Sequence, residues 1–534
     1  MIETPLNRRP WAAYILKGLF VATAGFIVAI TLLKSQFTHV LQHYYPLDTL
    51  LPHPVLMFCG IILTFAIYLA CTTTAQRINR LRQGRLCSER SVMLAAGLFF
   101  FLLQLLLIYN YYFETDWDVQ VLIDTARQVA DGNYNGEYYW YYSTYPNNVF
   151  LTQLFAVILW LAKPLHLGSH DFLSIVVVQS VACTVTGWML YQLARHCWKQ
   201  RGGAAAAYII YLLLIGLSPW TSIPYSDASA LIFPTAMLWI YACLPFNRHP
   251  AAKWLLITTI GYIGFRIKPQ VIFACISILA IDLYVCWRER DSLSVFAATL
   301  GRRLLMGFVG LMLSVAAVTI FTHAGPIKYK ASKRLGAPHY LMMGLNRNSI
   351  GDYNDADVVF ARSFPSIKER NKGELREAHR RVKEMTAGEF AHFMCEKTLV
   401  NYYDGTFFWG KEGYFYKTIY PEKNKHLSPF LRNLYYNRMI PGKYFPYWCS
   451  FATALWLGML ALMFVGGFGR GSRYTYAVII AILMLTLYEC LFESRARYFY
   501  IYVPFYILMA MEGLDWISEK CKHLRDKPFW AFTK

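Results

Sequence analysis

Two carboxylates separated by one residue, Asp116 and Asp118, are the side chains whose types and spacing best fit catalysis. They stand directly before a stretch in which apolar residues recur at helical spacing, from Val119 to Val129. Carboxylates fixed at the start of such a helix can hold a divalent cation, or one of them can take a proton from an incoming hydroxyl. Alternatively, Asp116 or Asp118 only caps the helix, because acids are favoured at helix N-termini.

Four cations form the second candidate group. Arg266 and Lys268 interrupt a long apolar region, and Arg495 and Arg497 lie in a turn between two apolar stretches. A cation inside a membrane segment costs roughly 2.5 to 3.5 kcal/mol, so it needs an anionic partner or a route to the interface. Because arginine can bind a phosphate through two parallel hydrogen bonds, these residues are candidate ligands of a lipid phosphate. Alternatively, the side chains of Arg266 and Lys268 extend to the membrane interface without binding a ligand. Arg495 and Arg497 could instead pair with the neighbouring glutamates.

Aromatic, amide and acidic side chains form a third group. The candidate substrate-binding residues are Tyr145, Asn147, Asn148, Tyr225, Asp227 and Asp404. Sugars are bound through this mixture, with aromatic faces against C–H surfaces and amides or acids on hydroxyls. However, turns also use Asn and Asp, and Asp227 stands where it could cap the apolar helix that follows.

These residues belong to a chain of 534 residues that is 56% hydrophobic and only 16% charged. Soluble domains carry roughly 25% charged residues, and a helix needs roughly 20 residues to cross a bilayer. We therefore predict an all-α polytopic membrane protein with twelve or thirteen spans. The twelve clear spans are Trp11 to Leu33, Val55 to Thr73, Met93 to Tyr109, Phe172 to Leu193, Ala204 to Leu217, Ala228 to Leu244, Trp254 to Gly264, Val271 to Trp287, Leu304 to Thr322, Trp448 to Val465, Tyr474 to Leu491 and Tyr498 to Met511.

The basic loops predict the orientation of these spans. Clusters of Lys and Arg, such as Arg77 to Arg90 and the region around Lys199, mark cytoplasmic loops and place both termini inside. The acidic pair, the turns at Asp227, Lys268 and Arg495 and the long polar loop then share the outer side. Val149 to Leu161 is apolar but short, and we predict that it is re-entrant or lies in the interface.

The chain divides into five segments. They are N-terminal spans (1–110), an outer loop with the acidic motif (111–148), a central bundle (149–322), a large outer loop (323–446) and C-terminal spans with a cytoplasmic tail (447–534). In the large loop, Thr386 followed by Glu389 predicts a capped helix, and Glu374 to Glu384 predicts a charged one. The net charge of +20 resides in short clusters and this loop, which favours lipid contacts over nucleic acid.

The order of these elements resembles the GT-C superfamily of membrane glycosyltransferases, which includes protein O-mannosyltransferases and aminoarabinose transferases. The resemblance lies in the acidic pair of a first outer loop, the surface helix and the element Tyr145-Pro146-Asn147-Asn148, and it extends loosely over most of the chain. It implies that Asp116 or Asp118 is the catalytic base and that Lys268 contacts the donor phosphate. Two extra spans before the motif, and the lack of charged residues around Asn147, depart from the family.

We therefore expect an inverting transfer of a sugar from a polyprenyl-phosphate donor to an acceptor hydroxyl, on a glycan or another molecule, outside a bacterial plasma membrane. Arg266, Lys268, Arg495 and Arg497 would stabilise the departing phosphate. Asp116 and Asp118 are the expected ligands of a divalent cation such as Mg²⁺ or Mn²⁺, if the reaction uses one.

Two other functions remain open. A polysaccharide polymerase or O-antigen ligase also has many spans and one large outer loop, and His379 or His392 would then be essential. A transporter would need repeated halves and ionisable residues at mid-membrane. The sequence shows no obvious repeat, and its charges favour the outer edge.

Overall fold

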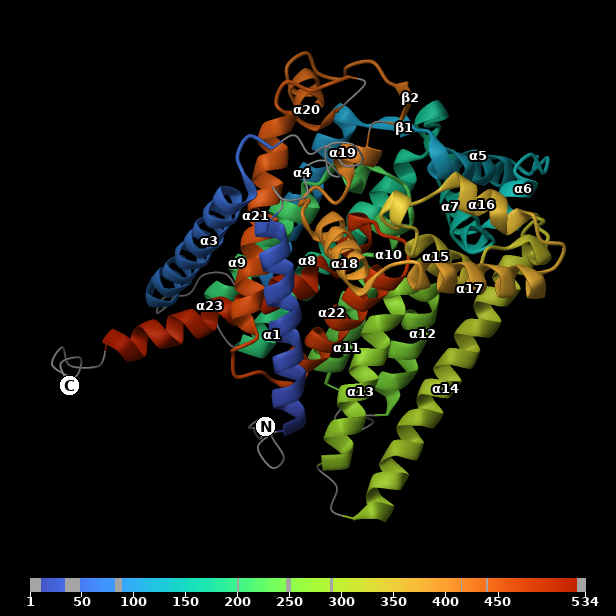
Figure 1. Ribbon diagram of the computed structural model, residues 1–534. Coiled ribbons are helices and arrows are strands. Elements are labelled where there is room, and N and C mark those ends of the chain that lie inside the picture. The colour runs from blue at the N-terminus through green and yellow to red at the C-terminus, as the bar shows by residue number, and fades with distance from the viewer. Residues whose placement is uncertain are drawn as a thin grey trace.

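The computed structural model describes residues 11–33, 49–81, 89–198, 201–245, 251–288, 292–413, 415–437 and 440–525. Arg82, Arg85 and Lys199, which contribute to the predicted cytoplasmic loops, lie outside these residues. The described chain is a bundle of helices with a single two-stranded sheet (Figure 1). The predicted class, an all-α polytopic membrane protein, is confirmed.

Nine helices of the described residues are long and apolar enough to cross a membrane. Eight of the nine coincide with predicted spans, and the ninth covers the short stretch from Asn148. In the structure these helices are α1 (Trp11–Leu32), α3 (His53–Leu81), α4 (Glu89–Tyr111), α7 (Asn148–Ala162), α8 (Leu173–Trp198), α13 (Ile272–Arg288), α14 (Leu293–Ala324), α21 (Phe445–Gly466) and α22 (Arg473–Leu491).

The other four predicted spans are helical but shorter or interrupted. A π-helical turn at Leu212–Gly216 lies within the first of them, and a 3-10 segment, η9 (Ala496–Tyr502), overlaps the start of the last. Such interruptions release backbone groups from the regular helical hydrogen-bond pattern. The helices concerned are α9 (Arg201–Tyr211), α10 (Ser226–Ala230), α11 (Ile232–Cys243), α12 (Ala252–Ile267) and α23 (Val503–Arg525).

Helix α21 is the most buried of the nine candidate spans and packs against α3 and α23 through glycines. A side chain on Gly60 of α3 would fall on the backbone of Ala454, and one on Gly458 would meet Gly60. Farther along α21, a side chain on Gly513 of α23 would meet the backbone of Leu462. Small residues of this kind let helix backbones approach closely, as is common in membrane helix pairs.

Most polar segments cover one end of the bundle, which we call the loop end. Here β1 (Phe113–Thr115) of the first loop pairs antiparallel with β2 (Tyr416–Ile419) of the long loop, with Phe113 opposite Ile419. The helices of this end are α5 (Trp117–Asp131), α6 (Tyr139–Thr144), α15 (Ala337–Gly344), α16 (Asp355–Arg362), α17 (Ile367–Lys383), α18 (Ala387–Tyr402), α19 (Trp409–Glu412) and α20 (Leu427–Tyr435). Figure 1 shows the sheet and α20 at the top, with α15, α17 and α18 below them at mid-height.

Local predictions for this end are confirmed where they rest on helix periodicity and capping. Helix α5 is amphipathic and buries the apolar face predicted from Val119 onward. Thr386 and Glu389 form the predicted capping box at the start of α18. The charged stretch from Glu374 lies within α17. The strand pairing that joins the two loops has no local signal of this kind and was not predicted.

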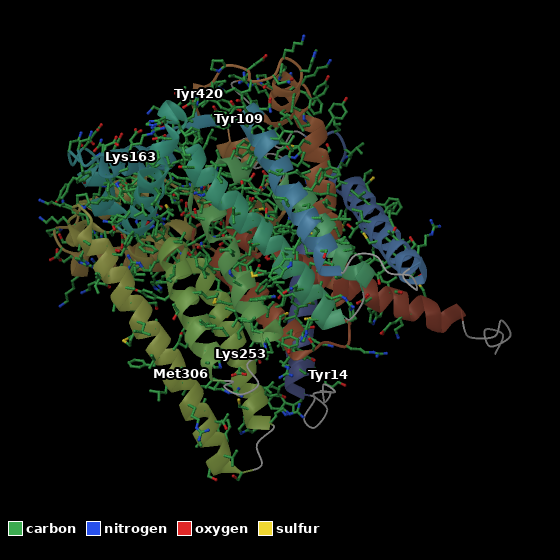
Figure 2. The ribbon with its side chains drawn as sticks, turned by 180° about the vertical axis from the view of Figure 1, so that it is seen from behind. Tyr14, Tyr109, Lys163, Lys253, Met306 and Tyr420 are labelled. Atoms are coloured by element: carbon green, nitrogen blue, oxygen red, sulfur yellow. The ribbon has the colours of Figure 1, made fainter. Side chains whose placement is uncertain are left out.

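Helix α7 has both its ends at the loop end. Its first residue, Asn148, adjoins the candidate site, and Lys163 at its other end donates a hydrogen bond to the backbone oxygen of Ala130 in α5 at 2.7 Å. Figure 2 places Lys163 toward the top with Tyr109 and Tyr420, whereas Lys253, Met306 and Tyr14 lie toward the bottom. Helix α7 has the length and hydropathy of a span, and the prediction that it does not cross stays a prediction.

Candidate active site

Strand β1 and helix α5 position the acidic pair. The backbone N–H of Asp116 donates to the carbonyl oxygen of Phe415 at 2.9 Å, which ties the start of α5 to the long loop. Between the two acids, Trp117 has φ +63°, a left-handed conformation that is rare for a bulky side chain. Such strain persists only where surrounding contacts enforce it, and it is frequent at functional sites. Here Trp117 packs against Tyr225, with ring centroids 5.0 Å apart.

The Asp118 carboxylate is half-buried and lies against phenol groups. Tyr225 donates a hydrogen bond to Asp118 Oδ2 at 3.0 Å. Burial raises the pKa of the Asp118 carboxyl, while hydrogen bonds from Tyr225 and Tyr141 and the charges of Arg497 and Arg495 offset part of that rise. A carboxylate with a raised pKa and some remaining exposure can accept a proton from a ligand.

Asp116 differs from Asp118 although only one residue separates them. Asp116 is exposed, and its side chain accepts a hydrogen bond from the backbone N–H of Trp117, as expected of a helix cap. The two acids thus have separate partners, and among the described residues no group of three or more His, Cys, Asp or Glu side chains is placed to hold a metal ion. Binding of a divalent cation by Asp116 and Asp118 stays a prediction.

Behind Asp118 lies a cluster of ion pairs that we call the charge network. It comprises Asp227, Lys268, Asp352, Lys411, Glu412, Glu493, Arg495 and Arg497. Segments far apart in the sequence contribute these residues: α10, the turn after α12, the long loop and the turn after α22. The turns predicted to share one side therefore meet at the loop end.

Asp227 joins two cations of the network, Lys268 and Arg497. Lys268 Nζ is 2.5 Å from Asp227 Oδ1, and Arg497 Nη1 is 3.7 Å from Asp227 Oδ2. Arg497 Nε also pairs with Glu412 at 3.2 Å. The Arg497 guanidinium carbon is 4.9 Å from the ring centroid of Trp117, so cation–π contact connects the network to the acidic motif.

Arg495 joins the carboxylates on the other side of the network. It pairs with Glu493 at 2.7 Å, with Asp352 at 3.4 Å and with Glu412. Lys411 completes the network by pairing with Asp352. The charges of Arg495 and Lys411 outweigh burial and lower the pKa of the Asp352 carboxyl. Four cations thus face four carboxylates, so the pairing that was the alternative for Arg495 and Arg497 is present in the structure.

The structure separates Arg266 from the other three candidate cations. Arg266 lies in the last turn of α12 and lines a cavity, whereas Lys268, two residues on, is buried in the charge network. The two cations of this turn therefore have different surroundings: Arg266 lies at the cavity, and Lys268 lies in the charge network.

Most of the candidate substrate-binding residues adjoin Asp118. Asn148 donates to the Tyr141 hydroxyl at 2.6 Å, and Tyr141 in turn hydrogen-bonds Asp118. Burial, the neighbouring Tyr353 and the Asp118 charge raise the pKa of the half-buried Tyr145 phenol.

Asn147 and Asp404 have other surroundings. Asn147 is exposed and lines the same cavity as Arg266. Asp404 accepts hydrogen bonds from the backbone N–H groups of Thr406 and Phe408 at 2.7 and 2.9 Å. It therefore supports the turn that leads into α19, where Lys411 and Glu412 reach the network.

Sequence reasoning missed four members of the site. Glu412, Asp352 and Lys411 have no distinguishing pattern in the long loop, and Tyr141 is one of several tyrosines in α6. The only available signal was the excess of acids and aromatics in these loops. The loop histidines lie elsewhere: His379 is exposed on α17, and His392 is half exposed on α18, 3.3 Å from Glu396 of the same helix.

Comparison with known proteins supports the membrane assignment. A family model described as "Conserved hypothetical integral membrane protein" matches residues 12–516, a range that includes every residue of the site above. The chain matches no curated protein and no solved structure. This protein therefore belongs to that family of conserved integral membrane proteins, whose description states a location and no activity.

Proposed function

We propose that this protein is a glycosyltransferase that moves a sugar from a polyprenyl-phosphate donor to an acceptor hydroxyl. One observation carries the proposal: Asp118 is a half-buried carboxylate with a raised pKa, held by Tyr225 at 3.0 Å beside a cluster of cations. The proposal is also supported by the segment 116–148, which resembles the corresponding segment of GT-C glycosyltransferases. A base and cations at one place suit a reaction that needs a nucleophile on one side and a leaving phosphate on the other.

In this reaction Asp118 accepts the proton of the acceptor hydroxyl. The hydroxyl oxygen forms a bond to the anomeric carbon while the bond from that carbon to the phosphate oxygen breaks. The electron pair of the breaking bond stays on the phosphate, which leaves on its lipid. Because the nucleophile attacks opposite the leaving group, the configuration at the anomeric carbon is inverted.

Lys268 and Arg497 are the cations proposed to face the departing phosphate. Asp227 orients both of them, through contacts of 2.5 and 3.7 Å. A phosphate arriving beside them competes with the carboxylates of Asp227 and Glu412 for these two cations. Fixed cations of this kind stabilise the charge that grows on the leaving group.

The loop end is proposed to face the extracytoplasmic side of a bacterial plasma membrane. The basic loops predict that the opposite end of the bundle is cytoplasmic. The prenyl chain of the donor would then lie in the bilayer, and a glycan or another hydroxyl-bearing acceptor would approach Asp118 from outside.

Replacement of Asp118 by Asn tests the proposal. With the purified full chain, polyprenyl-phosphate-linked hexoses or pentoses and an extract of cell-surface glycans, we expect Asp118→Asn to lower transfer by about 10² to 10⁴, the usual contribution of a general base. Release of polyprenyl phosphate measures the rate. Asp116→Asn is the matched control, since asparagine also caps helices and Asp116 is exposed. Equal turnover of Asp118→Asn and the unmodified chain would rule out this mechanism.

A further inference from the structure

A cavity of about 470 Å³ lies on the other side of the turn that holds Lys268. Phe265, Arg266 and Pro269 of this turn line the cavity, together with the start of α15 and the first turns of α17. Arg266, Arg334 and Arg370 are its charged lining residues, and no Asp or Glu is among them. The cavity therefore has a positive lining, in contrast to the balanced network next to it.

Arg370 shows that the cavity is built around a buried charge. Its residue exposure is 4%, and its two Nη groups donate to the carbonyl oxygens of Lys333 at 3.4 Å and Arg334 at 2.5 Å. Its Nε is buried without a hydrogen-bond partner in the described part of the chain. Glu374, one turn farther along α17, is instead 3.3 Å from His339. A buried guanidinium without a carboxylate is costly unless a bound anion supplies the opposite charge.

The remaining lining groups suit a phosphate. Arg334 is exposed at the cavity, so a ligand can reach it, and Arg266 lies in the intermediate range between buried and exposed. The guanidinium group matches phosphate geometry with paired hydrogen bonds. The amides of Asn147 and Asn371 add further polar contacts. A volume of about 470 Å³ is large enough for a phosphate with part of the group that it is joined to.

The position of the cavity fits a ligand that approaches from the membrane surface. Helix α12 ends at Ile267, and α14 ends at Ala324. The candidate span that contains α13 begins between them in sequence, at Pro269. In Figure 1, α15 and α17 lie at the level where α12 and α14 end. Phosphate groups of membrane lipids occur at the depth where spans end.

We propose that this cavity is a phosphate-binding site formed by Arg266, Arg334 and Arg370, distinct from the charge network around Asp118. The phosphate belongs to a lipid head group at the membrane surface or to a soluble phosphate. The inference concerns binding alone, so it does not rest on the proposed transfer reaction.

Binding to the full chain in phosphatidylcholine nanodiscs tests the site. One arm adds phosphatidic acid to the nanodiscs and counts retained lipid by native mass spectrometry, and the other titrates inorganic phosphate. We expect Arg266→Gln and Arg334→Gln each to lower the affinity roughly ten- to hundredfold, because each removes a charge-assisted hydrogen bond. Arg376→Gln, an exposed arginine of α17 outside the cavity, is the matched control and should bind as the unmodified chain does.

Each outcome decides the proposal. Arginine-dependent binding in the lipid arm alone supports a head-group site, and arginine-dependent binding of inorganic phosphate supports a soluble ligand. Equal binding by Arg334→Gln, Arg266→Gln and the control, or no binding in either arm, overturns the site. If Arg370→Gln unfolds, Arg370→Lys keeps the charge but not the paired hydrogen bonds and should bind less. Asp118→Asn should bind normally, which separates failure of this site from failure of the transfer reaction.

Discussion

The charge network and the arginine cavity lie on opposite sides of one turn but treat their cations differently. In the network, Lys268 and Arg497 are buried at 4% and 5% exposure and share the carboxylate of Asp227. In the cavity, Arg266 and Arg334 keep some exposure and have no carboxylate within ion-pair distance among the described residues. Burial alone does not explain the difference, because Arg370 of the cavity is also buried, at 4% exposure, and has no carboxylate within ion-pair distance among the described residues. A buried charge without an opposite charge is costly, so Arg370 is the cavity residue that most needs a bound anion.

This contrast separates two roles of the cations, pairing with acids and binding a ligand, which the prediction from the sequence did not distinguish. Four cations were predicted to bind one donor phosphate, yet the structure pairs three of them with acids and leaves Arg266 with a different set of neighbours. Paired cations hold the loop end together and orient the surroundings of Asp118. Unpaired cations are available to a ligand.

The largest expected effect comes from breaking the network at Arg497. Arg497→Met leaves Asp227 and Glu412 each with one partner fewer in a buried site, so we expect the free energy of unfolding to fall by about 3 to 5 kcal/mol. Unfolding in detergent, followed by circular dichroism with increasing denaturant, measures the loss. Arg497→Lys keeps the charge and should lose less. Unchanged stability in Arg497→Met would show that the ion pairs do not hold the loop end together.

A second expected effect concerns the pH dependence of the proposed transfer. Asp118 must be ionised to act as a base, so the rate falls as pH drops through its pKa, which burial has raised. Tyr225→Phe removes a hydrogen bond that stabilises the ionised form, and the acidic limb of the profile should move to higher pH by roughly 1 to 2 units. The rate of transfer between pH 4 and 9 measures the shift.

Tyr112→Phe is the control for this experiment, since the Tyr112 hydroxyl hydrogen-bonds the His170 ring at 2.9 Å and is not among the groups that shift the pKa of Asp118. Its profile should match that of the unmodified chain. A Tyr225→Phe profile that stays in place, or moves to lower pH, would contradict the assignment of Asp118 as the base.

The smallest expected effect comes from the cavity. Arg334→Gln removes an exposed charge without a carboxylate partner among the described residues, so the free energy of unfolding should change by no more than about 0.5 kcal/mol. The same unfolding experiment measures it beside Arg497→Met. A loss as large as that of Arg497→Met would mean that Arg334 is structural, and the contrast between the two regions would disappear.

Local sequence patterns determined the class of this protein and several of its elements. Apolar stretches predicted a polytopic all-α membrane protein, helical spacing from Val119 predicted α5, and Thr386 with Glu389 predicted the cap of α18. These predictions succeed because periodicity and capping depend on residues within one or two turns of each other. The acidic pair and the cations were also recognisable as unusual residues at the ends of apolar stretches.

Only the tertiary structure decided how those residues are used. The left-handed backbone of Trp117 separates an exposed Asp116 from a half-buried Asp118, and this backbone is held by contacts with Tyr225 and Arg497. Likewise, Glu412 reaches Arg497 only because the long loop folds over the turn after α22. Ion pairs and burial depend on segments far apart in the chain, so neighbouring residues carry no information about them.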